Sequence, residues 1–205
     1  MAIRLIAGLG NPGRKHGRDR HNAGFWFAER LAARERVAFR TEPKFDAHAA
    51  RLPGDVWLLL PQTYMNLSGN AVGALARFYK IEPEEVLVAH DELDFPPGTV
   101  KLKLGGGVAG HNGLTDIAER FGSKDFWRLR IGIGHPGDKA LVPGYVLSAP
   151  SPDDRVLIDD AIARSLEVMP LVLAGDLQAA TTKLHTRPKP QTPAAPDDAP
   201  GGSRP

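Results

Sequence analysis

Hydrophobic positions follow two spacings that alternate along the chain. Short apolar or alternating runs, each bounded by glycine, proline or polar residues, predict strands at 3–9, 45–51, 56–60, 86–89, 99–104 and 127–134. Apolar residues at helical spacing predict helices at 25–36, 72–79, 114–121, 152–174 and 177–184. Alternating strands and helices predict a single α/β domain, in which helices cover both faces of a twisted sheet. The hairpin-like spacing of 45–51 and 56–60 predicts a mixed rather than a purely parallel sheet. Pro170 predicts a kink or break in the helix that contains it.

Composition narrows the class of protein. With 205 residues, of which 42% are hydrophobic, the chain can bury one sizeable core and has little room for a second. It has no cysteine, which excludes disulfides and thiolate metal sites and favours a cytoplasmic location. No run approaches the length of a membrane span, and the N-terminus does not resemble a secretory signal. From Pro188 onward the chain is mostly Pro, Gly, Ala and Asp, so we predict a folded domain at 1–187 and a disordered tail at 188–205.

The net charge is only +2, but the cationic residues gather in two places. One group surrounds His21 and consists of Arg14, Lys15, Arg18 and Arg20. The other lies on two predicted strands and consists of Lys101, Lys103, Arg128 and Arg130. Such groups are either solvated surface or contacts to phosphate beside a functional site.

Two glycine-rich segments resemble phosphate-binding motifs only in part. Gly8-x-Gly10-x-x-Gly13 follows a predicted strand, yet no helix opens at Gly13, so a dinucleotide site is disfavoured. Gly105-x-x-x-x-Gly110 resembles the start of a P-loop but lacks the Lys-Ser/Thr that must follow. This second segment is interpreted either as a flexible lid over a site or as a tight connection between a strand and a helix.

The candidate chemistry centres on His21, which lies just before a predicted helix. Asp91 follows a predicted strand, and Asn11, Asn66 and Asn112 lie in loops. Because the carboxyl ends of strands meet at one edge of an α/β sheet, these side chains could converge there. The chain has no Gly-x-Ser-x-Gly elbow, so a histidine with a carboxylate partner indicates a general base that acts on water. Asparagine amides could bind a peptide group or a developing oxyanion.

A metal site is the alternative to a histidine base that acts on water. The candidate ligands are His90, Asp91, Asp94, His111 and His135. None of them has the spacing of a known metal motif, so we expect neither a metal nor any other cofactor.

Seven segments, taken in order, resemble those of bacterial peptidyl-tRNA hydrolases over residues 2 to about 187. They are Gly8-Leu-Gly-Asn-Pro-Gly13, Arg20-His-Asn-Ala-Gly24, Tyr64-Met-Asn-Leu-Ser-Gly69, His90-Asp-Glu-Leu-Asp94, Lys101-Leu-Lys-Leu-Gly-Gly-Gly107, Gly110-His-Asn-Gly113 and Arg128-Leu-Arg-Ile-Gly-Ile-Gly-His-Pro-Gly137. The resemblance implies a cytoplasmic, mostly monomeric, metal-independent enzyme that does not act at a membrane. Its reaction is hydrolysis of the ester between a peptide and the 3′-terminal ribose of tRNA.

The resemblance also implies roles for individual residues. His21 corresponds to the catalytic base, and Asp91 to the carboxylate that orients it. Contacts to the peptide and the CCA end are implied for Asn11, Tyr64, Met65, Asn66, His111 and Asn112. Contacts to the acceptor stem of the tRNA are implied for His16, Lys101, Lys103 and Arg130.

The chain departs from the family pattern beside His21, where His16 replaces a usual tyrosine and Asp19 a usual threonine. We expect altered packing or hydrogen bonding at this place. Two alternatives remain, a nucleic-acid-binding protein without chemistry and a general hydrolase of small N-acyl esters. The first needs no aligned histidine and aspartate, so a hydrogen bond between His21 and Asp91 would distinguish it from an enzyme.

Overall fold

A computed structural model describes residues 1–186, and within them one sheet organises the fold. Its strands are β1 (Leu5–Gly8), β2 (Arg40–Glu42), β3 (Ala47–Leu52), β4 (Val56–Pro61), β5 (Val86–Glu92), β6 (Val100–Leu104) and β7 (Trp127–Gly132). They form a seven-stranded sheet in the order β2-β3-β4-β1-β5-β7-β6. The central strands β4, β1, β5 and β7 are parallel, while β2–β3, β3–β4 and β6–β7 are antiparallel pairs. The predicted mixed sheet is therefore confirmed.

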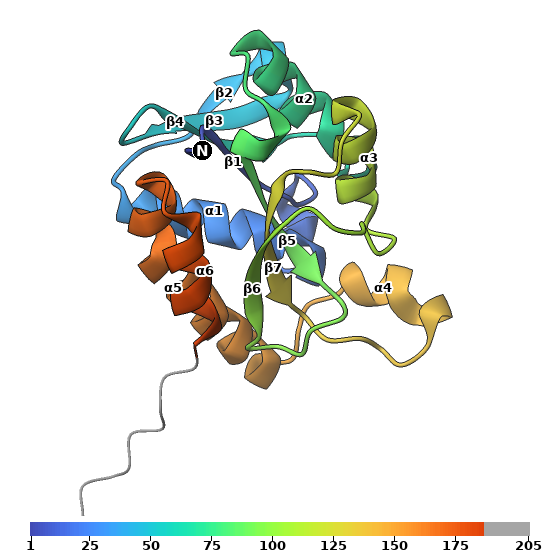
Figure 1. The fold of residues 1–205 in the computed structure, drawn as a ribbon. Coiled ribbons are helices and arrows are strands. Elements are labelled where there is room, and N and C mark those ends of the chain that lie inside the picture. Colours follow the sequence, from blue (N-terminus) through green and yellow to red (C-terminus); the bar gives the residue numbers. More distant parts are fainter. Residues whose placement is uncertain (187–205) are drawn as a thin grey trace, which may run out of the picture.

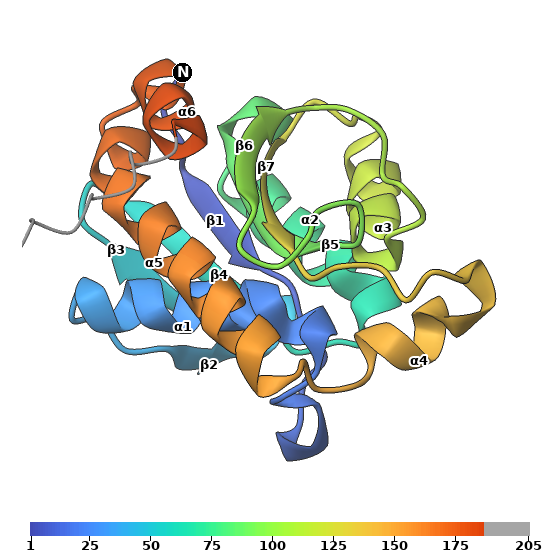
Figure 2. The same ribbon diagram turned by 90° about the horizontal axis from the view of Figure 1, so that it is seen from below.

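Helices cover both faces of this sheet (Figures 1 and 2). They are α1 (Ala23–Arg34), α2 (Ser68–Phe78), α3 (Asn112–Phe121), α4 (Val142–Val146), α5 (Pro152–Leu173) and α6 (Leu177–His185). Buried side chains of α1, α5 and α6 pack in one cluster on one face, and those of α2 and α3 pack in a second cluster on the other. Helix α4 lies beyond the end of β7 (Figure 2), and its buried Val146 belongs to the first cluster.

Two glycines allow α1 to approach the sheet closely. A Cβ atom on Gly8 would lie 2.3 Å from the carbonyl oxygen of Gly24, and one on Gly24 would lie 2.3 Å from that of Ala89. The approach is completed by the amide of Phe25, which donates to the carbonyl of Leu9 at 3.2 Å. Gly8 and Gly24 thus serve packing, and they fix the start of α1 beside the end of β5.

Most predicted elements are confirmed with small shifts in their boundaries. The helix predicted at 152–174 continues through Pro170 in its last turn, so the predicted break is wrong. The strand predicted at 86–89 extends to Glu92, which places Asp91 inside β5 rather than beyond it. The short elements β2 and α4 were not predicted. Within residues 1–186, no helix combines the length and apolar content that a membrane crossing requires. The predicted tail at 188–205 lies outside the described residues.

Candidate active site

Most predicted site residues come from segments at the carboxyl ends of the parallel strands β4, β1 and β5. Asn11 and His21 follow β1, Asn66 follows β4, and Asp91 lies at the end of β5. His111 follows β6 and stands at the N-terminus of α3, at the end of the glycine-rich loop. The expected convergence at one edge of the sheet is confirmed for His21 and Asp91, which contact each other. His111 joins them by a different route, because the glycine-rich loop after the antiparallel strand β6 leads back to this edge.

One buried carboxylate accepts hydrogen bonds from two imidazoles. Nδ1 of His21 lies 2.9 Å from Oδ2 of Asp91, and Nε2 of His111 lies 2.8 Å from Oδ1. The Asp91 side chain is only 2% exposed, so its charge is held in place by these two partners. The rings of His21 and His111 are 5.0 Å apart between centroids.

These contacts fix the tautomers of both neutral imidazoles. An ionised carboxylate only accepts hydrogen bonds, so His21 must carry its proton on Nδ1 and His111 on Nε2. Nδ1 of His111 is then free to accept from the amide of Leu114 at 3.3 Å, which caps α3. Nε2 of His21 has an unshared electron pair and no hydrogen-bond partner within residues 1–186. Of the two imidazoles, His21 is therefore the one that can accept a proton.

The electrostatics of the site favour a charged Asp91 and a basic His21. Burial opposes protonation of His21, but the charge and hydrogen bond of Asp91, together with the charge of Asp19, outweigh it and raise the pKa of His21. Burial would raise the pKa of Asp91, but the two histidines hold it well below its usual range. Burial and then the neighbouring imidazole of His111, whose ring centroid is 5.1 Å away, lower the pKa of His90 to about 3, so His90 is neutral.

The amide residues form a separate, firmly held group. The side chain of Asn22 binds the backbone of Asn11 twice, accepting from its amide at 2.8 Å and donating to its carbonyl at 3.0 Å. Asn22 occupies the N-cap position of α1, but its side chain makes no capping hydrogen bond there. The Asn11 side chain in turn accepts from the amide of Met65 at 2.8 Å, so its own amide nitrogen is free to donate. Sequence reasoning did not identify Asn22 as a residue that orients Asn11.

The short helix η4 (Met65–Leu67) carries the remaining predicted peptide contacts. Met65 is buried, while Tyr64 and Asn66 are exposed. A Cβ atom on Gly113 would lie 2.7 Å from Sδ of Met65 and 3.2 Å from Cε1 of His111, so η4 and α3 pack tightly. Among the described residues, no hydrogen bond joins Asn66 or Tyr64 to the His21–Asp91 pair.

A cavity of about 470 Å³ opens onto the His21–Asp91–His111 cluster. Asn112 also lines it, and no serine, threonine or cysteine does. One wall of the cavity includes Val142 and Val146 of α4, which the sequence interpretation missed. Their i, i+4 spacing, with Pro143 in the first turn, was a weak signal for such a helix.

Arg20 attaches this wall to the segment that carries His21. Its guanidinium lies 3.9 Å from the ring centroid of Tyr145 and donates to Oγ of Ser148 at 2.7 Å. The backbone amide of Arg20 also donates to the carbonyl of Ser148. Arg20 is thus buried and structural, not a phosphate contact.

Among the predicted tRNA contacts, Lys101, Lys103 and Arg130 share one face of β6 and β7, because Lys101 stands opposite Arg130 in the register. Arg128 differs from them. It is buried and donates to the carbonyls of Gly106, Gly107 and Lys124, so it holds the glycine-rich loop against the sheet.

His16 lies outside the cavity that His21 lines. Its Nδ1 is 2.7 Å from Oδ2 of Asp19, so the two residues that depart from the family pattern pair with each other. Both side chains are largely buried, with 14% and 10% exposed.

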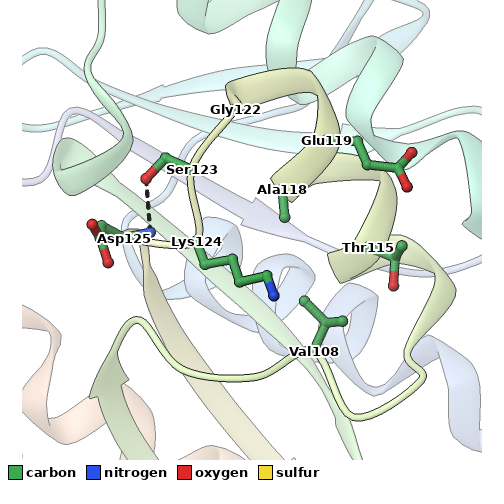
Figure 3. Close-up of a pocket in the computed structure, with 8 residues that line it drawn as sticks. All are labelled: Val108, Thr115, Ala118, Glu119, Gly122, Ser123, Lys124 and Asp125. Carbon is green, nitrogen blue, oxygen red and sulfur yellow. Dashed lines mark hydrogen bonds between the residues drawn. The ribbon is translucent and has the colours of Figure 1, made fainter.

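A larger hollow of about 610 Å³ lies beside the glycine-rich loop and α3 (Figure 3). It is lined by Val108, Thr115, Ala118, Glu119, Gly122, Ser123, Lys124 and Asp125. None of these residues belongs to the predicted site, and none is an imidazole. The chemistry of the lining, not the volume, therefore identifies the smaller cavity as the candidate active site.

Metal binding is geometrically conceivable at the same place. Ligand atoms of His21, Asp91 and His111 lie within 4.8 Å of one another. Of the metal ligands weighed from the sequence, only Asp91 and His111 are in this group. Nδ1 of His21 and Nε2 of His111 face the Asp91 carboxylate as hydrogen-bond donors. A cation bound between these atoms would have to displace the protons on both nitrogens.

Comparison with known proteins identifies the family. A model of the family described as peptidyl-tRNA hydrolase matches residues 5–192. The peptidyl-tRNA hydrolase of Neisseria meningitidis serogroup A is 57% identical over 188 residues, covering 90% of this chain and 98% of that protein. That of Delftia acidovorans is 56% identical over 199 residues, covering 94% and 96%. The crystal structure of the Acinetobacter baumannii peptidyl-tRNA hydrolase superposes with a TM-score of 0.86 at 46% identity, covering 89% of this chain and 94% of that one. With its fold, its site and these relatives in agreement, the chain belongs to the peptidyl-tRNA hydrolase family.

Proposed function

We propose that this protein hydrolyses the ester bond between a peptide, or an N-blocked amino acid, and the 3′-terminal ribose of tRNA. It would do so in the cytoplasm as a monomer, without a metal or other cofactor, and would return the tRNA for reuse. One observation carries the proposal. In a chain of this family, the Asp91-bound His21 presents a free Nε2 to a cavity whose lining has no serine, threonine or cysteine.

In the proposed mechanism, Nε2 of His21 takes a proton from water as the water attacks the ester carbonyl. Asp91 keeps the proton of His21 on Nδ1 and stabilises the imidazolium that forms. His111 acts through Asp91, because its hydrogen bond fixes the carboxylate in the orientation that His21 requires. When the tetrahedral intermediate collapses, the proton passes to the departing 3′ oxygen of the ribose, which leaves free tRNA and a peptide carboxylate.

Neutral amides would hold the acyl part of the substrate. The free amide nitrogen of Asn11 can donate to a peptide carbonyl, and Asn112 can donate to the developing oxyanion or to the water. Asn66, Tyr64 and Met65 would extend this surface along the peptide. An amide cradle suits a substrate whose peptide sequence varies, since it binds the backbone and adds no charge.

The exposed cations would bind the tRNA. Lys103 and Arg130 would contact the 5′ phosphate of the acceptor stem, with Lys101 beside them, and His16 would also contact the tRNA. Phosphate contacts give affinity that depends on salt and not on base sequence. This suits an enzyme that must accept many tRNAs.

The test compares two substrates: an N-blocked aminoacyl-tRNA and the same N-blocked ester on a short 3′-terminal oligonucleotide. Release of free tRNA without added metal is expected. Lys103→Ala and Arg130→Ala should raise KM for the tRNA substrate and flatten its salt dependence. Because the oligonucleotide substrate lacks the stem phosphate, the same variants should hydrolyse it about as well as the parent does. Equal losses of activity on both substrates would show that Lys103 and Arg130 do not bind the acceptor stem.

The same experiment separates the alternatives. A general esterase would hydrolyse both substrates equally well and would ignore the two cation variants. A nucleic-acid-binding protein without chemistry would bind the tRNA and release nothing. A binding protein without chemistry would not need His21 and Asp91 to be aligned, so the hydrogen bond between them supports an enzyme.

A further inference from the structure

Four cations stand on one face of β6 and β7. Lys101 faces Arg130 across the strand pair, and Lys103 faces Arg128. Like charges directly opposite each other repel, and the alternate positions of each strand share the same face. Something must therefore hold Arg130 in place next to Lys101 and Arg128.

Glu92, at the end of β5, makes the only ion pair that these four cations form within residues 1–186. Its Oε1 lies 2.9 Å from Nη2 of Arg130. The Glu92 side chain is 7% exposed and that of Arg130 is 22% exposed, so the carboxylate lies beneath the guanidinium and the guanidinium faces solvent. β5 pairs with β7 in a register that sets His90 opposite Arg130, which brings the Glu92 carboxylate to the same face.

Phe95 provides a second support for the same guanidinium. The Cζ atom of Arg130 lies 4.3 Å from the centroid of the Phe95 ring, and Nζ of Lys101 lies 5.1 Å from it. A planar guanidinium on an aromatic face has a fixed tilt, and such contacts attract both cations to the ring. Arg130 has five N–H donors and within residues 1–186 uses one, on Glu92, so its other donors can bind a ligand.

We propose that Glu92 and Phe95 are positioning residues for tRNA, which hold the Arg130 guanidinium so that its free edge meets the 5′ phosphate of the acceptor stem. This inference rests on the proposed function for the identity of the ligand. Glu92 is next to Asp91 in β5, so one strand end supplies both the carboxylate that orients the catalytic base and the carboxylate that orients the phosphate-binding arginine.

The charge of Glu92 also offsets repulsion within the group. Burial and then Arg130 lower the pKa of Arg128, while Glu92 acts in the opposite direction. Because Arg128 holds the carbonyls of the glycine-rich loop, neutralising Glu92 would loosen Arg130 and increase the repulsion on that loop anchor.

Glu92 could instead compete with the phosphate for Arg130, and this role predicts the opposite effect on tRNA binding. If Glu92 competed with the phosphate for Arg130, its removal would free the guanidinium and tighten tRNA binding. If Glu92 and Phe95 instead orient Arg130, removal of either weakens the recognition of the phosphate.

The experiment measures binding of tRNA with a 5′ phosphate and of the same tRNA with a 5′ hydroxyl, which needs no hydrolysis. The parent should bind the phosphorylated form more tightly. Glu92→Gln keeps the shape of the side chain and removes its charge, and Phe95→Leu removes the aromatic face. Each should reduce the preference for the 5′ phosphate by about three- to tenfold, the range expected when a charge-assisted contact becomes a neutral one. Asp55→Asn is the matched control, since it removes one carboxylate from an exposed ion pair with Arg51 in the turn between β3 and β4.

The salt dependence gives a second readout. Arg130→Ala should flatten it, whereas Glu92→Gln keeps all four cations and should not. An unchanged or increased preference for the 5′ phosphate in both variants would overturn the inference, as would an equal decrease in Asp55→Asn. If Glu92→Gln does not fold, Phe95→Leu decides. If the parent prefers the phosphate but hydrolyses no ester, the proposed function fails and the positioning role stands.

Discussion

Replacing Asp91 by asparagine tests the centre of the proposed mechanism. Asp91 accepts from His21 at 2.9 Å and from His111 at 2.8 Å, and it is almost fully buried. An asparagine offers one oxygen and one NH₂ group to these two imidazoles. If its NH₂ group faces His21, Nδ1 must accept, the proton moves to Nε2, and the base is lost. If its oxygen faces His21, the tautomer survives but the charge that stabilises the imidazolium is gone.

The structure sets the size of the expected loss. A hydrogen bond to a charged partner contributes about 1.5–3 kcal/mol, and the tautomer preference adds to this loss. A total of about 3–5 kcal/mol corresponds to a decrease of about 10²–10⁴ in kcat/KM. The equivalent change in the serine protease triad lowers kcat by about 10⁴, which agrees with the upper end.

The pH profile gives a readout that simple damage to the fold would not. In the parent, activity should fall as the pH drops through the raised pKa of His21, because a protonated imidazole cannot accept a proton. In Asp91→Asn the burial of His21 remains while the carboxylate that raised its pKa is gone. The acid limb of kcat/KM should therefore move to lower pH, together with the lower maximum.

The assay follows release of tRNA from N-blocked aminoacyl-tRNA between pH 5 and 9, with Asp55→Asn as the control for loss of a carboxylate. Asp91→Asn combined with His21→Ala should be little worse than His21→Ala alone, because both act on the same proton transfer. An acid limb that stays in place or moves upward would refute the reasoning, and so would full additivity of the two losses.

The remaining predictions address the base, the packing and the metal. His21→Ala should lower kcat by about 10²–10⁴ with an unchanged circular dichroism spectrum, and near-parental turnover would remove its role as base. Gly24→Ala would place a Cβ atom 2.3 Å from the carbonyl oxygen of Ala89, so we expect a stability loss of at least about 1–3 kcal/mol by denaturant unfolding, and a neutral effect would contradict the packing argument. Activity should survive EDTA, and its loss with recovery on one added metal would favour a metal bound by His21, Asp91 and His111.

The sequence alone determined the class of fold and the set of catalytic candidates. Apolar runs and helical spacing are local properties, so they predicted the strands and helices without knowledge of their partners. The hairpin spacing predicted the mixed sheet, and the motif order predicted the pair His21 and Asp91. Element ends were less accurate, because the last residues of β5 are extended by pairing with β7, a contact that the local pattern does not contain.

Only the tertiary structure decided how the site is held together. That Asp91 serves two histidines follows from α3 starting beside the end of β5, and Asn22 turns from a helix cap to the backbone of Asn11 because the chain folds back on itself there. Arg20, Arg128 and Arg130 look alike in the sequence, yet one anchors a wall, one anchors a loop and one faces solvent above Glu92. Residue type and spacing fix what a side chain can do. Burial and partners, which come from segments distant in the sequence, decide which of those possibilities each residue takes.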